Sequence, residues 1–175
     1  AWSIEAALKS CEIDRVVVST DDEEIAEAAR KYGAEVPFMR PSELAQDDTP
    51  GICVQFHALE WLRDRQGYMP DYSLLLQPTS PLRIHEDIDN IIVMTREKRA
   101  EAALSLIIAE QNPFWMKKID SDGHVSPFLD ESHYHMAQRQ DLPKVYIPNG
   151  ALFVANAALL LKHRSVLPLE TYGYI

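Results

Sequence analysis

The residues best placed for chemistry stand where a hydrophobic segment meets two prolines. Residues 74–76 are three leucines, which predict a strand buried on both faces, and Gln77 follows at its carboxyl end. The segment 78–81, Pro-Thr-Ser-Pro, prevents a simple continuation as helix or central strand. Ligands of open α/β sheets bind just beyond the carboxyl ends of strands, so Gln77 is a candidate ligand contact. An ordinary proline-rich turn explains the same residues equally well.

Further candidates lie in the polar segment 137–143 and shortly after it. Arg139 carries a planar guanidinium that suits a carboxylate or a phosphate, and Gln140 offers both a hydrogen-bond donor and an acceptor. The alternative is a solvated loop without a ligand. Asn149 and Gly150 predict a type I′ turn between two short strands. The alternative there is that Gly150 lets the backbone approach a ligand closely.

Other polar residues give weaker signals for chemistry. The acidic run 21–24 begins a predicted helix, where it caps amide groups and complements the helix dipole. Asp47 and Asp48 could face a cation, although hydrogen bonding within a turn explains them as well. His133 and His135 have no cysteine or carboxylate pair at ligand spacing, so we expect solvent exposure rather than a metal site. The six glycines are scattered and form no phosphate-binding loop.

Length and composition place the chain among ordinary globular proteins. With 175 residues, 46% of them hydrophobic and 25% charged, it is long enough for one domain with a substantial core. A net charge of −10 argues against non-specific binding of nucleic acid, which requires a basic surface. No apolar run reaches membrane-spanning length, and no signal peptide is evident. Cys11 and Cys53 lack metal-ligand spacing and are expected to be buried thiols of a reducing compartment.

The amino-terminal half alternates helical and strand patterns. Apolar spacing predicts helices over residues 2–8 and 23–32, and apolar runs predict strands over 13–18 and 35–38. This alternation predicts parallel pairing and a doubly wound sheet. A polar loop with one helical turn, a long helix, the leucine strand, another helix and a strand are expected next, around 40–50, 52–62, 71–77, 85–98 and 102–109.

The pattern changes beyond Glu110. A hairpin is expected there, with strands at 114–119 and 124–125 around the turn residues 120–123. A stretch rich in His, Gln and Arg follows it. The remaining elements are predicted to be short strands and one helix, at 145–147, 151–154, 156–163 and 172–175.

Five sequence blocks resemble the acylneuraminate cytidylyltransferase family, whose members activate sialic acid or its bacterial nonulosonic relatives. They occur in the family's order: VVVSTDDEEIAEAARKYGAEV at 16–36, RPSELAQDDTP at 40–50, LLLQPTSPLR at 74–83, RQDLPKVYIPNGALFV at 139–154 and the closing YGYI. The combination is specific and covers most of the chain, whereas a single short motif from it would be weak.

The resemblance implies a Rossmann-like nucleotidyltransferase fold, an α/β sheet with helices on both faces. It implies one cytidylyltransferase domain over residues 1–175, with a small hairpin and helix insertion, about residues 112–145, that forms a dimer and reaches toward the partner's site. The implied reaction converts CTP and a nine-carbon 2-keto sugar acid into a CMP-sugar and pyrophosphate, with Mg²⁺ as cofactor. The corresponding expectation is a cytoplasmic homodimer that binds neither nucleic acid nor membrane.

By matching position, the resemblance assigns roles to five residues. Gln77 corresponds to a glutamine that contacts the sugar at the strand end, and Arg40 to a residue of the loop that frames the cytosine. Arg139 and Gln140 correspond to the pair that meets the sugar acid, where a guanidinium can bind a carboxylate bidentately. Asn149 lies in the block that lines the same pocket.

The chain also departs from the family pattern. The family's Arg/Ser/Lys/Gly-rich phosphate loop and its Asp-x-Asp metal pair are not among these residues, so we expect a truncated form of a parent enzyme that keeps the sugar half of the site. Gly51 stands where the family has a serine, and Trp115 stands at or near a sugar-contacting lysine. These differences leave legionaminic or pseudaminic acid open as the substrate.

Two alternatives to a nonulosonic acid cytidylyltransferase remain at this point. One is a non-catalytic remnant that binds a sugar acid or dimerises. The other is a cytidylyltransferase for the eight-carbon acid Kdo, a related fold, against which the RQDLP and NG motifs argue.

Overall fold

The computed structural model describes residues 1–129, 138–165 and 170–175, except for the side chain of Arg139. The chain divides into two compact units, each described by itself below. The first unit consists of Ala1–Ser105 and Gly150–Tyr174, and the second of Leu106–Asn149 with Ile175. The region in which we expect the dimerisation insertion therefore falls within the second unit.

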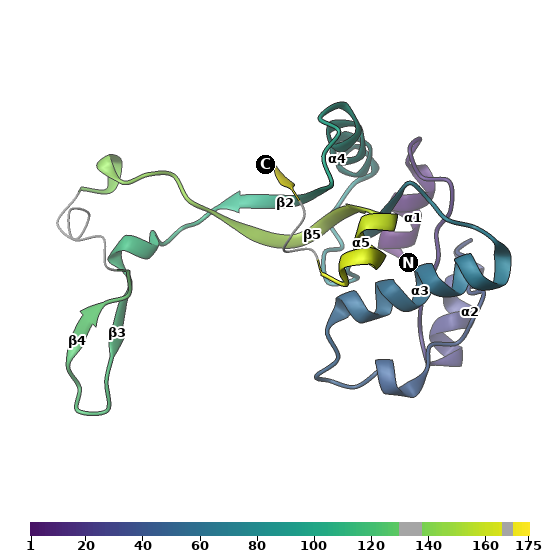
Figure 1. Cartoon of the computed structure of the whole chain (residues 1–175), viewed down its shortest axis with the longest axis horizontal. Helices are drawn as coiled ribbons and strands as arrows, with labels where there is room; N and C mark the ends of the chain where they lie inside the picture. Colours follow the sequence, from purple (N-terminus) through teal and green to yellow (C-terminus); the bar gives the residue numbers. More distant parts are fainter. Residues whose placement is uncertain (130–137, 166–169) are drawn as a thin grey trace. The chain divides into compact units, whose positions relative to one another are not determined.

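The first unit is built on a four-stranded sheet in the order β1, β5, β2, β6, of which Figure 1 labels the central pair, β5 and β2. The strands are β1 (Tyr72–Leu75), β2 (Ala102–Ile108), β5 (Tyr146–Asn156) and β6 (Thr171–Tyr174). β1 runs antiparallel to β5, whereas β2 and β6 run parallel. The sheet is therefore mixed.

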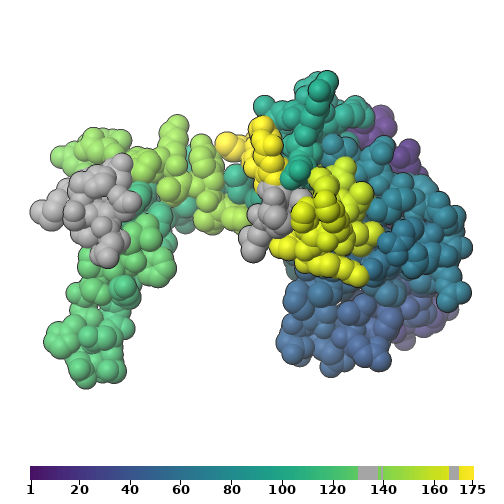
Figure 2. Space-filling view, viewed as in Figure 1, coloured from purple at the N-terminus to yellow at the C-terminus, as the bar shows by residue number. Residues whose placement is uncertain are grey.

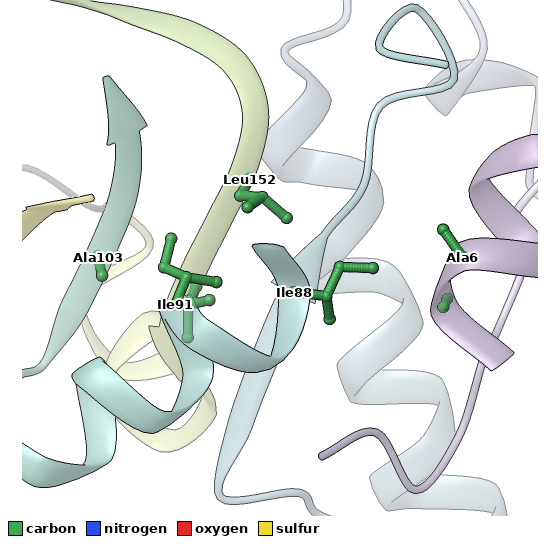
Figure 3. Packing of buried hydrophobic residues seen from close by; sticks show 7 residues of the cluster. Ala6, Ile88, Ile91, Ala103 and Leu152 are labelled. Atoms are coloured by element: carbon green, nitrogen blue, oxygen red, sulfur yellow. The ribbon is translucent and has the colours of Figure 1, made fainter. Parts of the chain in front are cut away.

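One face of the sheet is covered by α1 (Trp2–Lys9) and α4 (His85–Glu97), which pack on each other. Leu152 and Val154 of β5 share a core cluster with Ile88 of α4 and with the alanines of α1 (Figure 3). Both β5 side chains are almost fully buried. Because they stand two residues apart on a strand, they point to the same face.

The opposite face is covered by α3 (Gly51–Gln66) and α5 (Ala157–His163). Ala155 of β5 belongs to a second core cluster, with Phe56 of α3 and Leu160 of α5. The yellow residues of α5 lie against the blue residues of α3 in Figure 2. Since neighbouring residues of a strand point to opposite faces, the two clusters lie on the two sides of the sheet. The predicted α/β fold with helices on both faces is confirmed.

Local signals set the ends of α2 (Glu23–Lys31) and of α3. Asp22 caps α2, because its carboxylate accepts a hydrogen bond from the amide of Ile25 at 2.9 Å. Gly33, with a φ of 93°, follows the carboxyl end of α2. At the end of α3, Gly67 adopts a left-handed conformation and its amide donates to a helix carbonyl. The acidic run 21–24 thus includes a helix cap, as predicted.

Three predictions for this unit need correction. Residues 13–18 and 35–38 pair in parallel, as predicted, but through the single bridge of Val17 with Glu35, and they form no strand of the described sheet. The leucine segment is half-buried rather than buried on both faces, because β1 stands at one end of the strand order with β5 as its neighbour. Cys11 is exposed and Cys53 is half-buried, so the burial predicted for both thiols is wrong.

The second unit contains the predicted hairpin. β3 (Lys117–Ile119) and β4 (Val125–Pro127) pair in antiparallel fashion. Asp120 holds the turn between them, because its carboxylate accepts hydrogen bonds from the amides of Asp122 and His124 at 3.0 and 2.9 Å. Two short 3₁₀ helices complete the described elements of this unit, η2 (Pro113–Trp115) and η4 (Arg139–Asp141).

The predicted turn at Asn149 and Gly150 is wrong. One continuous strand, β5, passes through both residues, and Gly150 takes a left-handed φ of 73° within it. The polar loop around residues 40–50 contains one helical turn, η1 (Ser42–Leu44), as predicted. Within the described part of the chain, no helix is both long and apolar enough to cross a bilayer.

Candidate substrate site

Gln77 lies just beyond the end of β1, exposed to solvent and beside Gly150 of β5. A Cβ atom at position 150 would lie only 3.1 Å from Oε1 of Gln77. The left-handed φ of Gly150 and this narrow space both favour glycine over any other residue. The close contact at Gly150 is thus with the side chain of Gln77. An approach of this backbone to a ligand stays a prediction.

Arg83 binds the backbone on both sides of the same place. Its Nη1 donates to the carbonyl of Ala151 at 2.5 Å and to the carbonyl of Gln77 at 3.4 Å, and Nη2 also donates to Gln77 at 3.4 Å. Arg83 is only 7% exposed, and this burial lowers its pKa while the nearby carboxylate of Asp87 opposes the shift. The side chain of Gln77 thus lies against β5 at Gly150, and its carbonyl is linked to β5 through Arg83.

Sequence reasoning gave Arg83 no role. It is the one charged residue in the block 74–83, and it stands between the apolar residues Leu82 and Ile84. That position was an available signal, because a lone charge among apolar residues beside a strand end needs a partner. The partner itself, the carbonyl of Ala151, is 68 residues away in the chain and could not be read from local pattern.

Arg40 belongs to a second polar group in the first unit. Its amide donates to the carbonyl of Thr20 at 2.8 Å, and its Nη2 forms an ion pair with Asp21 at 2.8 Å. The hydrogen bond from Arg40 lowers the pKa of Asp21. Two other polar atoms here, Oγ of Ser19 and Nε of Arg40, are buried without a hydrogen-bond partner within the described residues. Such atoms are suited to a ligand, because buried polar groups rarely stay unpaired.

The remaining predicted site residues belong to the second unit. Arg139 begins η4, and its side chain is outside the described atoms. Gln140 is exposed, and its Nε2 donates to Oε1 of Gln138. Asn149 is exposed within β5. The grouping of these residues with the two candidates of the first unit in one pocket stays a prediction.

The described acidic and histidine side chains are spread too far apart for a metal site. No group of three or more His, Cys, Asp or Glu residues in the described ranges is arranged to hold a metal ion. Asp47 and Asp48 are therefore not part of such a group. His133 and His135 lie outside the described residues. The described side chains therefore give no ligand set for Mg²⁺, and Mg²⁺ binding stays a prediction.

Residues 1–169 match the cytidylyltransferase family. The chain belongs to this family. One relative is the CMP-N,N′-diacetyllegionaminic acid synthase of Legionella pneumophila, at 32% identity over 94% of this chain and 69% of the relative. Another is the pseudaminic acid cytidylyltransferase of Campylobacter jejuni (serotype O:2), at 34% identity over 93% of this chain and 68% of the relative. The N-acylneuraminate cytidylyltransferase of Escherichia coli O18:K1:H7 is 33% identical over the whole chain, which spans 40% of that protein.

Solved structures place the fold among nucleotidyltransferases. A CMP:2-keto-3-deoxy-manno-octonic acid synthetase in complex with CTP superposes with a TM-score of 0.65, over 99% of this chain and 77% of that protein, at 14% identity. A 4-diphosphocytidyl-2C-methyl-D-erythritol synthase from Anaerococcus prevotii gives a TM-score of 0.56, over 91% of this chain and 62% of that protein. The Rossmann-like fold implied by the sequence blocks is thereby confirmed.

Proposed function

We propose that this chain contributes the sugar-acid side of a cytidylyltransferase that converts CTP and a nonulosonic acid into a CMP-sugar and pyrophosphate. The observation that supports the proposal most strongly is the similarity, at 32% and 34% identity over more than nine-tenths of the chain, to relatives named for legionaminic and pseudaminic acids. The chain spans 69% and 68% of those two proteins, and we propose the activity for the full-length protein.

In the proposed reaction, the oxygen of the anomeric hydroxyl attacks the α-phosphorus of CTP. A bond forms between that oxygen and phosphorus, the bond from the α-phosphorus to the bridging oxygen breaks, and pyrophosphate leaves. The hydroxyl proton passes to solvent. Catalysis of this kind depends mainly on holding the two substrates in line, which is the task proposed for the residues of this chain.

Each predicted site residue has a proposed part in that task. Gln77 hydrogen bonds to the sugar acid from the end of β1, and its amide can both donate and accept. Arg139 binds the substrate carboxylate, with Gln140 and Asn149 in the same pocket. Arg40 serves the nucleotide end, which agrees with the unpaired Nε beside its ion pair with Asp21.

We further propose that the second unit mediates homodimer formation. The hairpin exposes large apolar side chains, including Ile119 at 70%, Val125 at 63% and Phe128 at 56% exposure. Gathered apolar side chains on a surface are typical of an interaction site, and a two-stranded hairpin alone is only marginally stable in water. A second copy of the chain is the partner that the family resemblance suggests.

Mg²⁺ and a cytoplasmic location complete the proposal, and both rest on the family resemblance. The cofactor is checked by treating the full-length protein with EDTA, which is expected to stop turnover, and then restoring Mg²⁺.

The test is pyrophosphate release by the full-length protein with CTP, Mg²⁺ and one sugar acid at a time. The panel contains N-acetylneuraminate, a legionaminate, a pseudaminate and Kdo. We expect release with at least one nine-carbon acid. No release with any of the four would overturn the proposal, and release with Kdo alone would support the eight-carbon alternative.

Binding measurements separate the remaining alternative, a non-catalytic remnant. Calorimetric titration of the full-length protein with each acid and with CTP gives the two affinities independently. Binding of a sugar acid together with no turnover would support the remnant and contradict the enzyme.

A further inference from the structure

Arg83 is buried at a place where no carboxylate of the described residues is in hydrogen-bond contact with its charge. Among the described side chains, it is the charged one with the least exposure, 7%, and its hydrogen bonds go to the carbonyls of Gln77 and Ala151. Its Nε is also buried and has no partner within the described residues. Burying a guanidinium in this way is costly, because lost hydration is only partly replaced. Core packing alone therefore gives a poor account of an arginine at this position.

The bonds of Arg83 fix the backbone from which the Gln77 side chain projects. Gln77 lies beyond the last residue of β1, so it is outside the strand pairing that holds Leu75 opposite Phe153. Arg83 replaces that pairing, because its two Nη groups reach the carbonyl of Gln77 and one of them also reaches β5 at Ala151. Arg83 thus connects β5 to the chain two residues beyond Leu75, the last paired residue of β1.

Gly150 lies on the other side of Gln77 and limits where the Gln77 amide can lie. Oε1 of Gln77 lies where a Cβ atom at position 150 would be only 3.1 Å away, and the left-handed φ of 73° keeps the backbone in that position. Gly150 and Ala151 are neighbours in β5, so one short piece of that strand meets Gln77 at its side chain and, through Arg83, at its carbonyl.

We propose that Arg83 is a positioning residue that holds the Gln77 amide in place for the sugar acid. This inference rests on the proposed function of Gln77, and it adds a residue that acts through Gln77 without touching the substrate. A guanidinium suits the task because its planar fork can bind two carbonyls at once, whereas a lysine ammonium offers a single point charge.

Steady-state kinetics of the full-length protein test the inference. Arg83→Lys is expected to raise KM for the sugar acid about tenfold and to leave KM for CTP within about twofold, since the loss of one positioned hydrogen bond is of that size. Arg63→Lys is the matched control, because Arg63 pairs with Asp64 on the surface of α3. An equal rise of both KM values, or no rise in either, would contradict a positioning role.

A double-mutant cycle shows whether Arg83 acts through Gln77. In a Gln77→Ala background, Arg83→Lys is expected to raise KM for the sugar acid by less than about twofold, because residues that act as one unit are not additive. The same tenfold effect in both backgrounds would contradict the inference, since Arg83 would then act on its own.

A structural readout keeps the inference separate from the proposed function. A crystal structure of Arg83→Lys is expected to show the Gln77 amide displaced from Gly150, and an unchanged position would overturn the positioning role whatever the enzyme does. If Arg83→Lys does not fold, Gly150→Ala perturbs the same amide from the other side, and the same selective rise in sugar KM is expected. If the wild-type protein turns over none of the sugar acids, the proposed function fails while the crystal structure still decides the positioning.

Discussion

At the scale of single residues, the amide of Gln77 is the group proposed to hold the sugar acid. We expect Gln77→Ala in the full-length protein to raise KM for the sugar acid about tenfold, because one hydrogen bond to a charged or polar substrate is lost. KM for CTP should change by less than about twofold. Steady-state kinetics with each substrate varied in turn measures both values. Gln66→Ala, at the exposed end of α3, serves as the control.

Asp89 gives a residue-scale prediction for pH. Burial raises its pKa, but hydrogen bonds from the Ser10 hydroxyl and from the amides of Cys11 and Glu12 outweigh it, so the net shift is downward. A carboxylate whose pKa is lower in the folded state stabilises the fold above its unfolded value and loses this effect as the pH falls through the folded value. Asp89→Asn should therefore destabilise the protein by about 1–2 kcal/mol at pH 7.

The difference between wild type and Asp89→Asn should begin to shrink below about pH 4, where the carboxylate of the unfolded chain becomes protonated, and should vanish as the pH falls through the lower folded-state pKa. Urea unfolding of both proteins at pH 7, 5 and 3.5 measures this difference in the free energy of unfolding. A difference that stays constant over this range would show that the charge of Asp89 does not hold the loop that follows α1.

At the scale of elements, the two ends of α3 offer a matched pair of glycines. A Cβ atom would meet no atom within 4 Å at either Gly51 or Gly67, so space is equal at both. Gly51 has ordinary helical surroundings, whereas Gly67 has a left-handed φ of 64°. Gly51→Ala should stabilise the protein by about 0.5 kcal/mol, and Gly67→Ala should destabilise it by about 1 kcal/mol.

Thermal unfolding of wild type, Gly51→Ala and Gly67→Ala measures the two changes in stability. Shifts of the same sign in both would contradict the assignment of Gly67 as the left-handed end of α3.

The elements also show what a sequence alone can predict. Helices such as α2 were predicted because their caps and apolar spacing are local, as with Asp22 and Ile25. The antiparallel pairing of Leu75 with Phe153 was not, since it joins distant parts of the chain. The turn prediction at Asn149 failed because a continuous strand and a hairpin turn both accept a glycine with positive φ.

The candidate site was predictable to the extent that it follows a motif. Gln77 and Arg40 were singled out from the sequence, and the structure gives each a polar setting: Gln77 beside Gly150 and Arg40 paired with Asp21. Arg83 was missed because its significance depends on the carbonyl that it reaches in β5. A contact between a side chain and a distant part of the backbone gives no local pattern in the sequence from which it could be predicted.

At the scale of the whole molecule, the exposed apolar hairpin carries the prediction of a dimer. Ile119→Asp should weaken self-association by at least about tenfold, because it places a charge in a surface that we expect to be buried in the dimer. Sedimentation velocity of the full-length protein over a range of concentrations measures the dissociation constant. Ile25→Asp is the control, since Ile25 is 54% exposed on α2 of the first unit. Equal behaviour of the two variants would argue against the hairpin as the dimer contact.

The central claim is that the full-length protein transfers CMP to a nine-carbon sugar acid. The most direct measurement gives it CTP together with equal amounts of N-acetylneuraminate, a legionaminate, a pseudaminate and Kdo, and identifies the products by mass spectrometry. A CMP-nonulosonate is expected as the main product, in reduced yield with Gln77→Ala. Formation of CMP-Kdo alone, or of no CMP-sugar at all, would contradict it.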